Sequence, residues 1–498
     1  MDFTVLEYKA AIPEAHGAYL AKDSWNDYGF STTFNLFVRL QDGTEVRVGF
    51  LRIGNVAMER TGWSRTSDRL PPRFEALEAG YFSLGMEDDY YEMLRLRLPR
   101  NMAHDILTAL NDAAYAWEPD QATTDLAVFS DSLMRDRTHK DLDRTRRVAQ
   151  GIRARIVPFS WSYTPEQEGL LPAHKFTFET KPGLLPPTNL HAVIGRNGVG
   201  KSRLLHAIAA QATTGEIAVE AGSGGEDNSF ASCVVISFSP FDRPYIPPPE
   251  AKMPFHYIGL RHREELRLKS DEELREEFVV SFATARIGAR GLRWRQAVET
   301  LNYAASGFLD DDMDVIDAMI REGSKKKLSE AMGKVFDNLS SGHAVVLLMV
   351  TRLIEVVGER TLVLIDEPET HLHPPLLAAL TNALSKLLAD RNGMAVAATH
   401  SPVVLQEVPA SCVWTMERHG DELTARRPDL ETYGESVGEL TYDVFGLEVS
   451  STGFHAAIAA EVENGGTYEE ITSRFTGLGA EARSLLRAMT FSRAQEER

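Results

Sequence analysis

The sequence predicts an α/β fold built on a mixed β-sheet, and three observations support this prediction. Short apolar runs alternate with helical stretches after Ile156, as in sheets whose strands are buried on both faces. A glycine-rich turn at Gly195 to Ser202 joins one such run to a helix, and another run ends in the acidic pair Asp366-Glu367. The runs are Lys175 to Thr180, Leu190 to Ile194, Cys233 to Ser237, Leu362 to Ile365 and Met394 to Ala398.

Composition limits the classes of protein to which the chain can belong. The chain has 498 residues, 43% of them hydrophobic, and a formal net charge of −19, which argues against a generally basic surface that coats nucleic acid. Its two cysteines, Cys233 and Cys412, have neither disulfide-framework nor zinc-site spacing. The chain shows no signal peptide and no apolar run of membrane-spanning length, so we expect a cytoplasmic protein without a membrane partner.

The domain organisation follows from changes in residue pattern. Residues 1–150 are expected to hold a β-hairpin between Phe34 and Val56, turning at Asp42-Gly43, and a helical region from about Pro72 to Trp117. This part could belong to the β-subdomain of the core. The core is expected at 151–445, with a helical insert at about 243–338, and a helical tail at 446–498.

The most basic part of the chain is the stretch from Arg135 to Arg155. We favour a solvated helix face with local ion pairs, since charged runs usually face water. A local nucleic-acid patch at 135–155 is the alternative.

The glycine-rich turn is a P-loop, Gly195-Arg196-Asn197-Gly198-Val199-Gly200-Lys201-Ser202. Gly195, Gly198 and Gly200 let the backbone, including that of Asn197, curl around phosphate oxygens at a helix N-terminus. Lys201 is expected to reach the β- and γ-phosphates, and the Ser202 hydroxyl to ligate Mg²⁺. The loop therefore predicts that ATP and Mg²⁺ are bound.

Two later strands end in side chains suited to hydrolysis. Asp366 is expected to hold the Mg²⁺ shell and Glu367 to orient the attacking water, as in a Walker B strand. His400 follows the strand Met394 to Ala398 and could hydrogen-bond the γ-phosphate. A lone histidine is usually structural, but its place after the Walker B strand favours the functional interpretation.

A fourth element, Leu339-Ser340-Ser341-Gly342-His343, precedes an apolar helix and resembles the signature motif of ABC-type ATPases. The resemblance implies an ABC-type P-loop head with a helical subdomain, in which Ser340 and Gly342 face the ATP bound by a second subunit. An ordinary serine helix cap is the structural alternative.

Two details narrow the resemblance: the form of the P-loop, and Asp366-Glu367-Pro368-Glu369-Thr370-His371-Leu372-His373-Pro374. Together they resemble the soluble ABC ATPases related to RecF and to the overcoming-lysogenization-defect proteins. Within that group the chain is most similar to the stand-alone ATPases of anti-phage systems such as Septu and some retrons. The resemblance implies a homodimer or higher oligomer that controls a partner effector, expected to be a nuclease.

The chain also departs from the family pattern. The expected Q-loop glutamine is replaced within Ser237 to Asp242, where Ser239 or Asp242 could supply an oxygen. After Pro402 no pattern resembles the Toprim nuclease domain of the overcoming-lysogenization-defect proteins, which needs a glutamate and an Asp-x-Asp pair. We therefore expect the nuclease activity to reside in a separate chain. A RecF-like DNA-repair ATPase and an ATP-clamped scaffold with negligible turnover are the alternatives.

Overall fold

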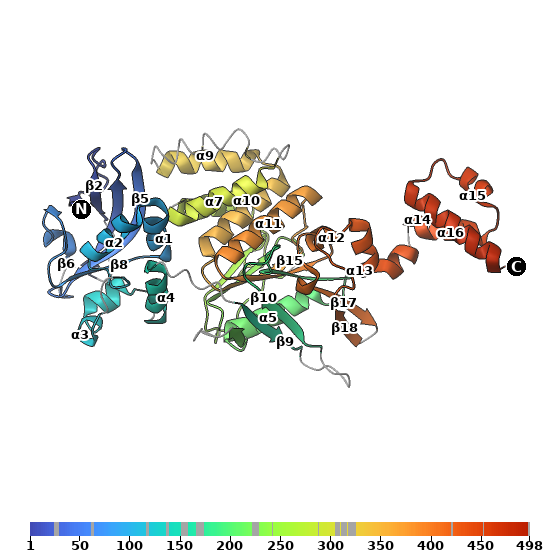
Figure 1. Cartoon of the computed structure of the whole chain (residues 1–498), viewed down its shortest axis with the longest axis horizontal. Helices are drawn as coiled ribbons and strands as arrows, with labels where there is room; N and C mark the ends of the chain where they lie inside the picture. The colour runs from blue at the N-terminus through green and yellow to red at the C-terminus, as the bar shows by residue number, and fades with distance from the viewer. Residues whose placement is uncertain are drawn as a thin grey trace. The chain divides into compact units, whose positions relative to one another are not determined.

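The computed structural model divides the chain into two compact units (Figure 1). The first unit comprises Met1–Val157 and Ser270–Val356, and the second comprises Pro158–Lys269 and Val357–Arg498. The structure describes residues 1–496 except 24–28, 61–63, 116–118, 136–138, 151–157, 166–173, 222–228, 242, 287, 304–308, 310–315, 317–324, 420–421 and 452.

A six-stranded sheet forms the base of the first unit, in the order β7-β1-β2-β4-β5-β8. The predicted hairpin is confirmed, because β4 and β5 pair antiparallel across a turn in which Gly43 has a φ of 84°. The strands are β1 (Phe3–Leu6), β2 (Gly17–Lys22), β4 (Thr33–Arg39), β5 (Glu45–Asn55), β7 (Arg73–Phe74) and β8 (Tyr81–Gly85), with β3 (Phe30–Ser31) and β6 (Ser64–Arg65) in a separate pair.

Helices complete the first unit. Those from the N-terminal segment are α1 (Asp88–Arg97), α2 (Arg100–Ala109), α3 (Gln121–Thr124) and α4 (His139–Ala149). Those from the second segment are α6 (Asp271–Ala285), α7 (Gly288–Leu301), α9 (Lys325–Asn338) and α10 (Ser341–Val356). Arg293 of α7 joins the two sets, because its guanidinium pairs with Asp89 and Glu92 of α1, both at 2.8 Å.

The sequence predicted mostly helix at three places that form strands, the first of which is the short strand β7 at Arg73–Phe74. Residues 81–85 form β8, which pairs with β5, although the helical prediction ran from 72 to 117. All five residues of β8 are buried, so its apolar pattern does not alternate as a half-buried strand does. Phe255–Gly259 form β14, which lies inside the predicted helical insert at about 243–338. This strand pairs with β13 (Ser232–Ser237).

The second unit is built on a seven-stranded sheet in the order β14-β13-β15-β16-β11-β17-β18. All neighbours are parallel except β17 and β18, so the predicted mixed sheet is confirmed. Residues of β11, β13, β15 and β16 are all buried, which explains their continuous apolar sequences. The strands are β11 (Leu190–Gly195), β13 (Ser232–Ser237), β14, β15 (Thr361–Asp366), β16 (Met394–Thr399), β17 (Val413–His419) and β18 (Glu422–Arg426).

A small sheet and further helices accompany the main sheet. The small sheet has the order β10-β9-β12, formed by β9 (Phe159–Tyr163), β10 (Phe176–Thr180) and β12 (Val219–Ala221). The helices are α5 (Lys201–Thr214), α11 (Pro374–Asp390), α12 (Pro402–Leu405), α13 (Val437–Ser451), α14 (Gly453–Glu463), α15 (Tyr468–Arg474) and α16 (Ala480–Glu496). Helices α14 to α16 enclose a hydrophobic cluster of their own.

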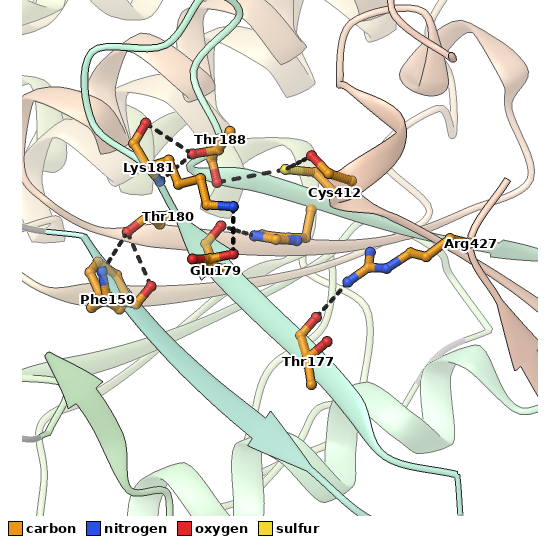
Figure 2. Close-up of polar contacts among 10 residues, drawn as sticks. Phe159, Thr177, Glu179, Thr180, Lys181, Thr188, Cys412 and Arg427 are labelled. Atoms are coloured by element: carbon orange, nitrogen blue, oxygen red, sulfur yellow. Dashed lines mark hydrogen bonds and ion pairs between the residues drawn. The ribbon is translucent and has the colours of Figure 1, made fainter. Parts of the chain in front are cut away.

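Arg427 links β10 to β17 of the main sheet. Its guanidinium donates to the carbonyl of Thr177 at 2.8 Å, as Figure 2 shows, and to that of Val413 at 2.9 Å. It also stacks over the ring of Trp414, with 3.8 Å between the guanidinium carbon and the ring centroid. Burial lowers the pKa of Arg427 to about 10. The same figure shows the Cys412 thiol facing the carbonyl of Thr188.

The predicted fold class, α/β with a mixed sheet, a helical part and added N- and C-terminal elements, is confirmed. The boundaries at 150/151 and 445/446 remain predictions. In the described part of the chain, no helix combines the length and the apolar character needed to cross a bilayer.

Candidate nucleotide site

The P-loop connects β11 to α5, and three glycines shape it. A Cβ on Gly195 would lie 2.3 Å from the carbonyl oxygen of Met416 in β17, so only glycine fits there. Gly198 and Gly200 have φ values of 74° and 108°, which residues with a Cβ rarely adopt. The loop therefore curls tightly before α5 begins at Lys201, and it presents a helix N-terminus suited to phosphate.

The Lys201 side chain is buried and folds back along the loop. Its ammonium donates to the carbonyls of Gly195 and Arg196, at 3.0 and 3.2 Å, and lies 2.7 Å from Nε2 of His400. Burial lowers the pKa of Lys201, while Glu367 and two further carboxylates act in the opposite direction. This brings together residues nearly 200 positions apart in the sequence.

The carboxylates lie at the end of β15. Asp366 is the last residue of the strand and is only 7% exposed. Glu367 follows with a φ of 46°, a left-handed conformation that is costly for a residue with a side chain, and its amide donates to the carbonyl of Ala398 at 2.9 Å. Its carboxylate reaches to 3.5 Å from Nε2 of His400. Backbone strain of this kind concentrates at functional sites.

The strand order explains why His400 lies close to both Lys201 and Glu367. Strand β16 lies between β11 and β15 in the sheet, so the carboxyl ends of all three strands meet at one edge. Burial lowers the pKa of His400, the charge of Lys201 lowers it further, and Glu369 acts to raise it. The lowered pKa favours a neutral imidazole, which can accept a hydrogen bond from Lys201.

Glu369 is a site residue to which the sequence analysis assigned no role. One carboxylate oxygen accepts from the backbone amide of His400 at 2.5 Å, and the other accepts from the Thr399 hydroxyl at 2.9 Å. The carboxylate therefore fixes the end of β16 and with it the position of the His400 ring. Its only sequence signal was its place two residues after Glu367.

Arg418 also went unnoticed in the sequence. This exposed β17 residue has a guanidinium nitrogen 3.9 Å from the point that a Cβ on Gly200 would occupy. A cation at the phosphate loop suits an anionic ligand, and a single arginine in a strand gives no motif to detect.

The remaining predicted residues are placed as follows. Ser202 is half-buried in the first turn of α5, and Asn197 is exposed in the loop. The Ser202 hydroxyl and the carboxylate of the buried Asp366 are oxygen donors of the kind that Mg²⁺ prefers. Ser239 accepts from the amide of Phe241 at 3.3 Å, whereas Asp242 lies outside the described residues.

The signature residues lie in the first unit, at the start of α10. The Ser340 hydroxyl lies 3.5 Å from the amide nitrogen of His343, and its carbonyl accepts from Ala344 at 2.9 Å, as in a helix N-cap. The contact of Ser340 and Gly342 with a second subunit stays a prediction. So does the basic patch at 135–155, most of whose basic side chains lie outside the described residues.

Part of the chain that includes several site residues matches a known protein family. Residues 237–406 match a family described as "AAA domain, putative AbiEii toxin, Type IV TA system", a range that includes Ser340, Glu367 and His400. Two solved structures are similar to more than half of the chain. One is an inward-facing putative metal-chelate type ABC transporter (16% identity, 58% of this chain and 89% of that one, TM-score 0.29). The other is cbiO1 from Clostridium perfringens, part of the transporter complex cbiONQ (13% identity, 59% and 94%, TM-score 0.30).

One relative matches along the whole chain. Protein ea59 of Escherichia phage lambda is 36% identical, and the match covers 99% of each protein. The domain match and the loop geometry identify an ATPase-like P-loop protein. The chain belongs to the family of the phage lambda protein ea59.

Proposed function

We propose that the chain binds ATP with Mg²⁺ at the loop from Gly195 to Ser202 and hydrolyses it. The observation that carries this proposal is the meeting of Lys201, Glu367 and His400 at one sheet edge, with His400 Nε2 2.7 Å from the ammonium and 3.5 Å from the carboxylate. A cation at a phosphate loop and a carboxylate that can act as a base are groups that enzymes use in phosphoryl transfer.

Each side chain has a distinct role in this proposal. The backbone amides of the loop and the Lys201 ammonium hold the β- and γ-phosphates. Ser202 and Asp366 would hold Mg²⁺, which when bound neutralises charge on the phosphate oxygens. Glu367 orients the attacking water and accepts its proton, and the neutral His400 ring hydrogen-bonds the γ-phosphate.

The test is the substitution Glu367→Gln. It keeps the size of the side chain and removes the base, so we expect ATP binding to persist while turnover falls by about a hundredfold or more. Fluorescent-nucleotide binding and multiple-turnover phosphate release measure the two quantities. Glu265→Gln, an exposed position in the same unit, is the matched control and should keep the parental rate. A Glu367→Gln protein with parental turnover would show that Glu367 is not the base.

The rival function is a scaffold in which ATP acts only as a clamp. Multiple-turnover phosphate release by the parent protein distinguishes the two, because a clamp releases no more than about one phosphate per site.

We further propose that the nucleotide site is shared between two copies. Each P-loop would face Ser340 and Gly342 of the partner copy, so the γ-phosphate would favour the closed dimer and hydrolysis would release it. The support is the serine-capped helix start at α10 and the resemblance of its sequence to the signature motif.

This ATP-driven switch would control a separate effector, expected to be a nuclease, in a system that excludes phage. The support is the resemblance of the P-loop and of the segment after Glu367 to those of stand-alone defence ATPases. Co-purification from the native host, followed by nuclease assays with parental and Glu367→Gln protein, tests this. A RecF-like repair ATPase would instead bind duplex DNA alone, with steep salt dependence.

A further inference from the structure

A cavity of about 360 Å³ lies within the first unit, apart from the P-loop. Its walls come from β5, the start of α1 and the helices α6, α7 and α9. The apolar part includes Phe50, Phe282 and Leu328. Cavities of this volume, mostly apolar with a few polar groups, are typical of small-molecule sites.

Arg286 supplies the unusual charge of this cavity. It lines the wall at the C-terminal end of α6, and its buried Nε has no hydrogen-bond acceptor among the described residues. Arg290, Glu87 and Asp89 line the same cavity, and Arg290 pairs with Glu87 and, at 3.5 Å, with Asp89. These two carboxylates are therefore engaged with Arg290. No carboxylate within the described ranges lies at ion-pair distance from Arg286.

A second arginine next to it increases the positive charge. Arg47 forms no ion pair within the described part of the chain: its guanidinium carbon lies 5.6 and 5.8 Å from the ring centroids of Phe50 and Phe37, and the Asn35 amide can turn its oxygen toward it. Burial lowers the pKa of Arg47, and the nearby charge of Arg286 lowers it further. Burying two guanidinium groups that have no counter-ion among the described residues lowers the stability of the folded chain.

We propose that this cavity binds a small amphiphilic anion. A carboxylate or phosphate group would pair with Arg286, and an apolar body would lie against Phe50, Phe282 and Leu328. Anion binding removes the cost of the unpaired charge, and the volume accommodates a single drug-sized molecule. The proposal does not depend on ATP hydrolysis, since no P-loop residue lines the cavity.

Sodium octanoate is the probe for the test, with 1-octanol and octylammonium as matched neutral and cationic probes. Isothermal titration calorimetry on the full-length chain should show saturable binding of octanoate only. In Arg286→Met the affinity should fall at least tenfold, because the charge-assisted hydrogen bonds are lost. Arg275→Met is the control, since Arg275 is on the same helix but pairs with Asp337 at 3.6 Å and does not line the cavity.

A second variant separates binding from folding. Ala283→Trp would fill the cavity from α6 while leaving Arg286 in place, and it should abolish octanoate binding while circular dichroism still reports a folded chain. If Arg286 only complements the dipole at the end of α6, Arg286→Met will lower stability and bind octanoate like the parent. Parental octanoate binding by Arg286→Met would overturn the proposal. So would binding of 1-octanol as tight as that of octanoate, or the absence of saturable octanoate binding by the parent.

Discussion

At the scale of single residues, the candidate site depends on Glu369 as well as on the groups that would touch nucleotide. Its carboxylate holds the His400 amide and the Thr399 hydroxyl at 2.5 and 2.9 Å. A residue that orients the end of a strand in this way acts through His400, so Glu369 is a positioning residue. Its negative charge also acts to raise the pKa of His400.

The substitution Glu369→Gln tests this positioning role. The amide keeps one acceptor oxygen and removes the charge, so we expect kcat for ATP to fall about tenfold with little change in KM. Without the negative charge, the pKa of His400 should fall further, and the acidic limb of the pH–kcat profile should move to lower pH.

The control for that experiment is Glu369→Asp, which keeps the charge on a shorter side chain. It should lower kcat without moving the acidic limb. An unmoved limb in Glu369→Gln would contradict the coupling of Glu369 to His400.

Sequence spacing predicted the residues of the candidate site that belong to contiguous motifs. Lys201, Asp366 and His400 each follow an apolar strand, and the structure brings them to one edge. Glu369 and Arg418 could not be assigned in this way, because their importance depends on contacts between distant segments. Likewise, the demand for glycine at 195 comes from a β17 carbonyl more than 200 residues away, although the motif predicted the residue.

At the scale of elements, the central strands of the main sheet, strand β10 and the β4–β5 hairpin were predictable, whereas β8 and β14 were not. Continuous apolar runs marked β11, β13, β15 and β16, because a parallel sheet covered on both faces buries every side chain. Strand β14 was not predicted because its first three residues are only partly buried at the sheet edge. Strand β8 was not predicted because its five residues are all buried and show no alternation. Pattern arguments are weakest for such short strands.

His191 in β11 makes the stability of the second unit sensitive to acid. Nε2 of its fully buried ring faces the carbonyl of Glu179 at 3.1 Å, and burial lowers its pKa to about 3. Below about pH 6.5 the unfolded chain binds a proton at this residue and the folded chain does not. This histidine therefore lowers the free energy of unfolding by about 1.4 kcal/mol per pH unit as pH falls from about 6.5 toward 3.

Replacing His191 by glutamine should remove that slope. Glutamine can still donate to the Glu179 carbonyl but does not titrate, so urea unfolding at about pH 6.5 and about pH 5 should show a smaller loss of stability than in the parent. His104→Gln, on the exposed side of α2, should keep the parental slope. Equal slopes for parent and His191→Gln would refute this assignment.

At the scale of the whole molecule, the sequence did not reveal how the segments assemble. The helical stretch Ser270–Val356 groups with Met1–Val157 in one compact unit. Much of that grouping comes from tertiary contacts, such as the Arg293 pairs with Asp89 and Glu92, which local periodicity does not encode. The signature residues and the P-loop consequently belong to different units.

Mixing two inactive variants tests the shared site. Lys201→Ala disables the P-loop of its own chain, and Gly342→Asp disables the signature that its chain would offer to a partner. Each variant alone should be inactive. A mixture should regain about a quarter of parental ATPase activity, since half of random two-fold dimers are mixed and each has one intact site of two.

Two further samples control this experiment. A chain carrying both substitutions, mixed with either single variant, should restore nothing, since no site then combines an intact P-loop with an intact signature. Full activity of Gly342→Asp alone would mean that each chain works without its partner.

The position of β11 in the sheet has a consequence for protein synthesis. Leu190 pairs with Ala395, roughly 200 residues further along the chain. At a synthesis rate of about 5–20 residues per second, Ala395 reaches the ribosome exit roughly ten to forty seconds after Leu190. Until then the apolar strand Leu190–Gly195 emerges with neither lateral neighbour, because β17 is made later still. A nascent chain with such an unpaired strand is prone to aggregation. The yield of active protein should therefore depend strongly on chaperones that bind the nascent chain during this interval.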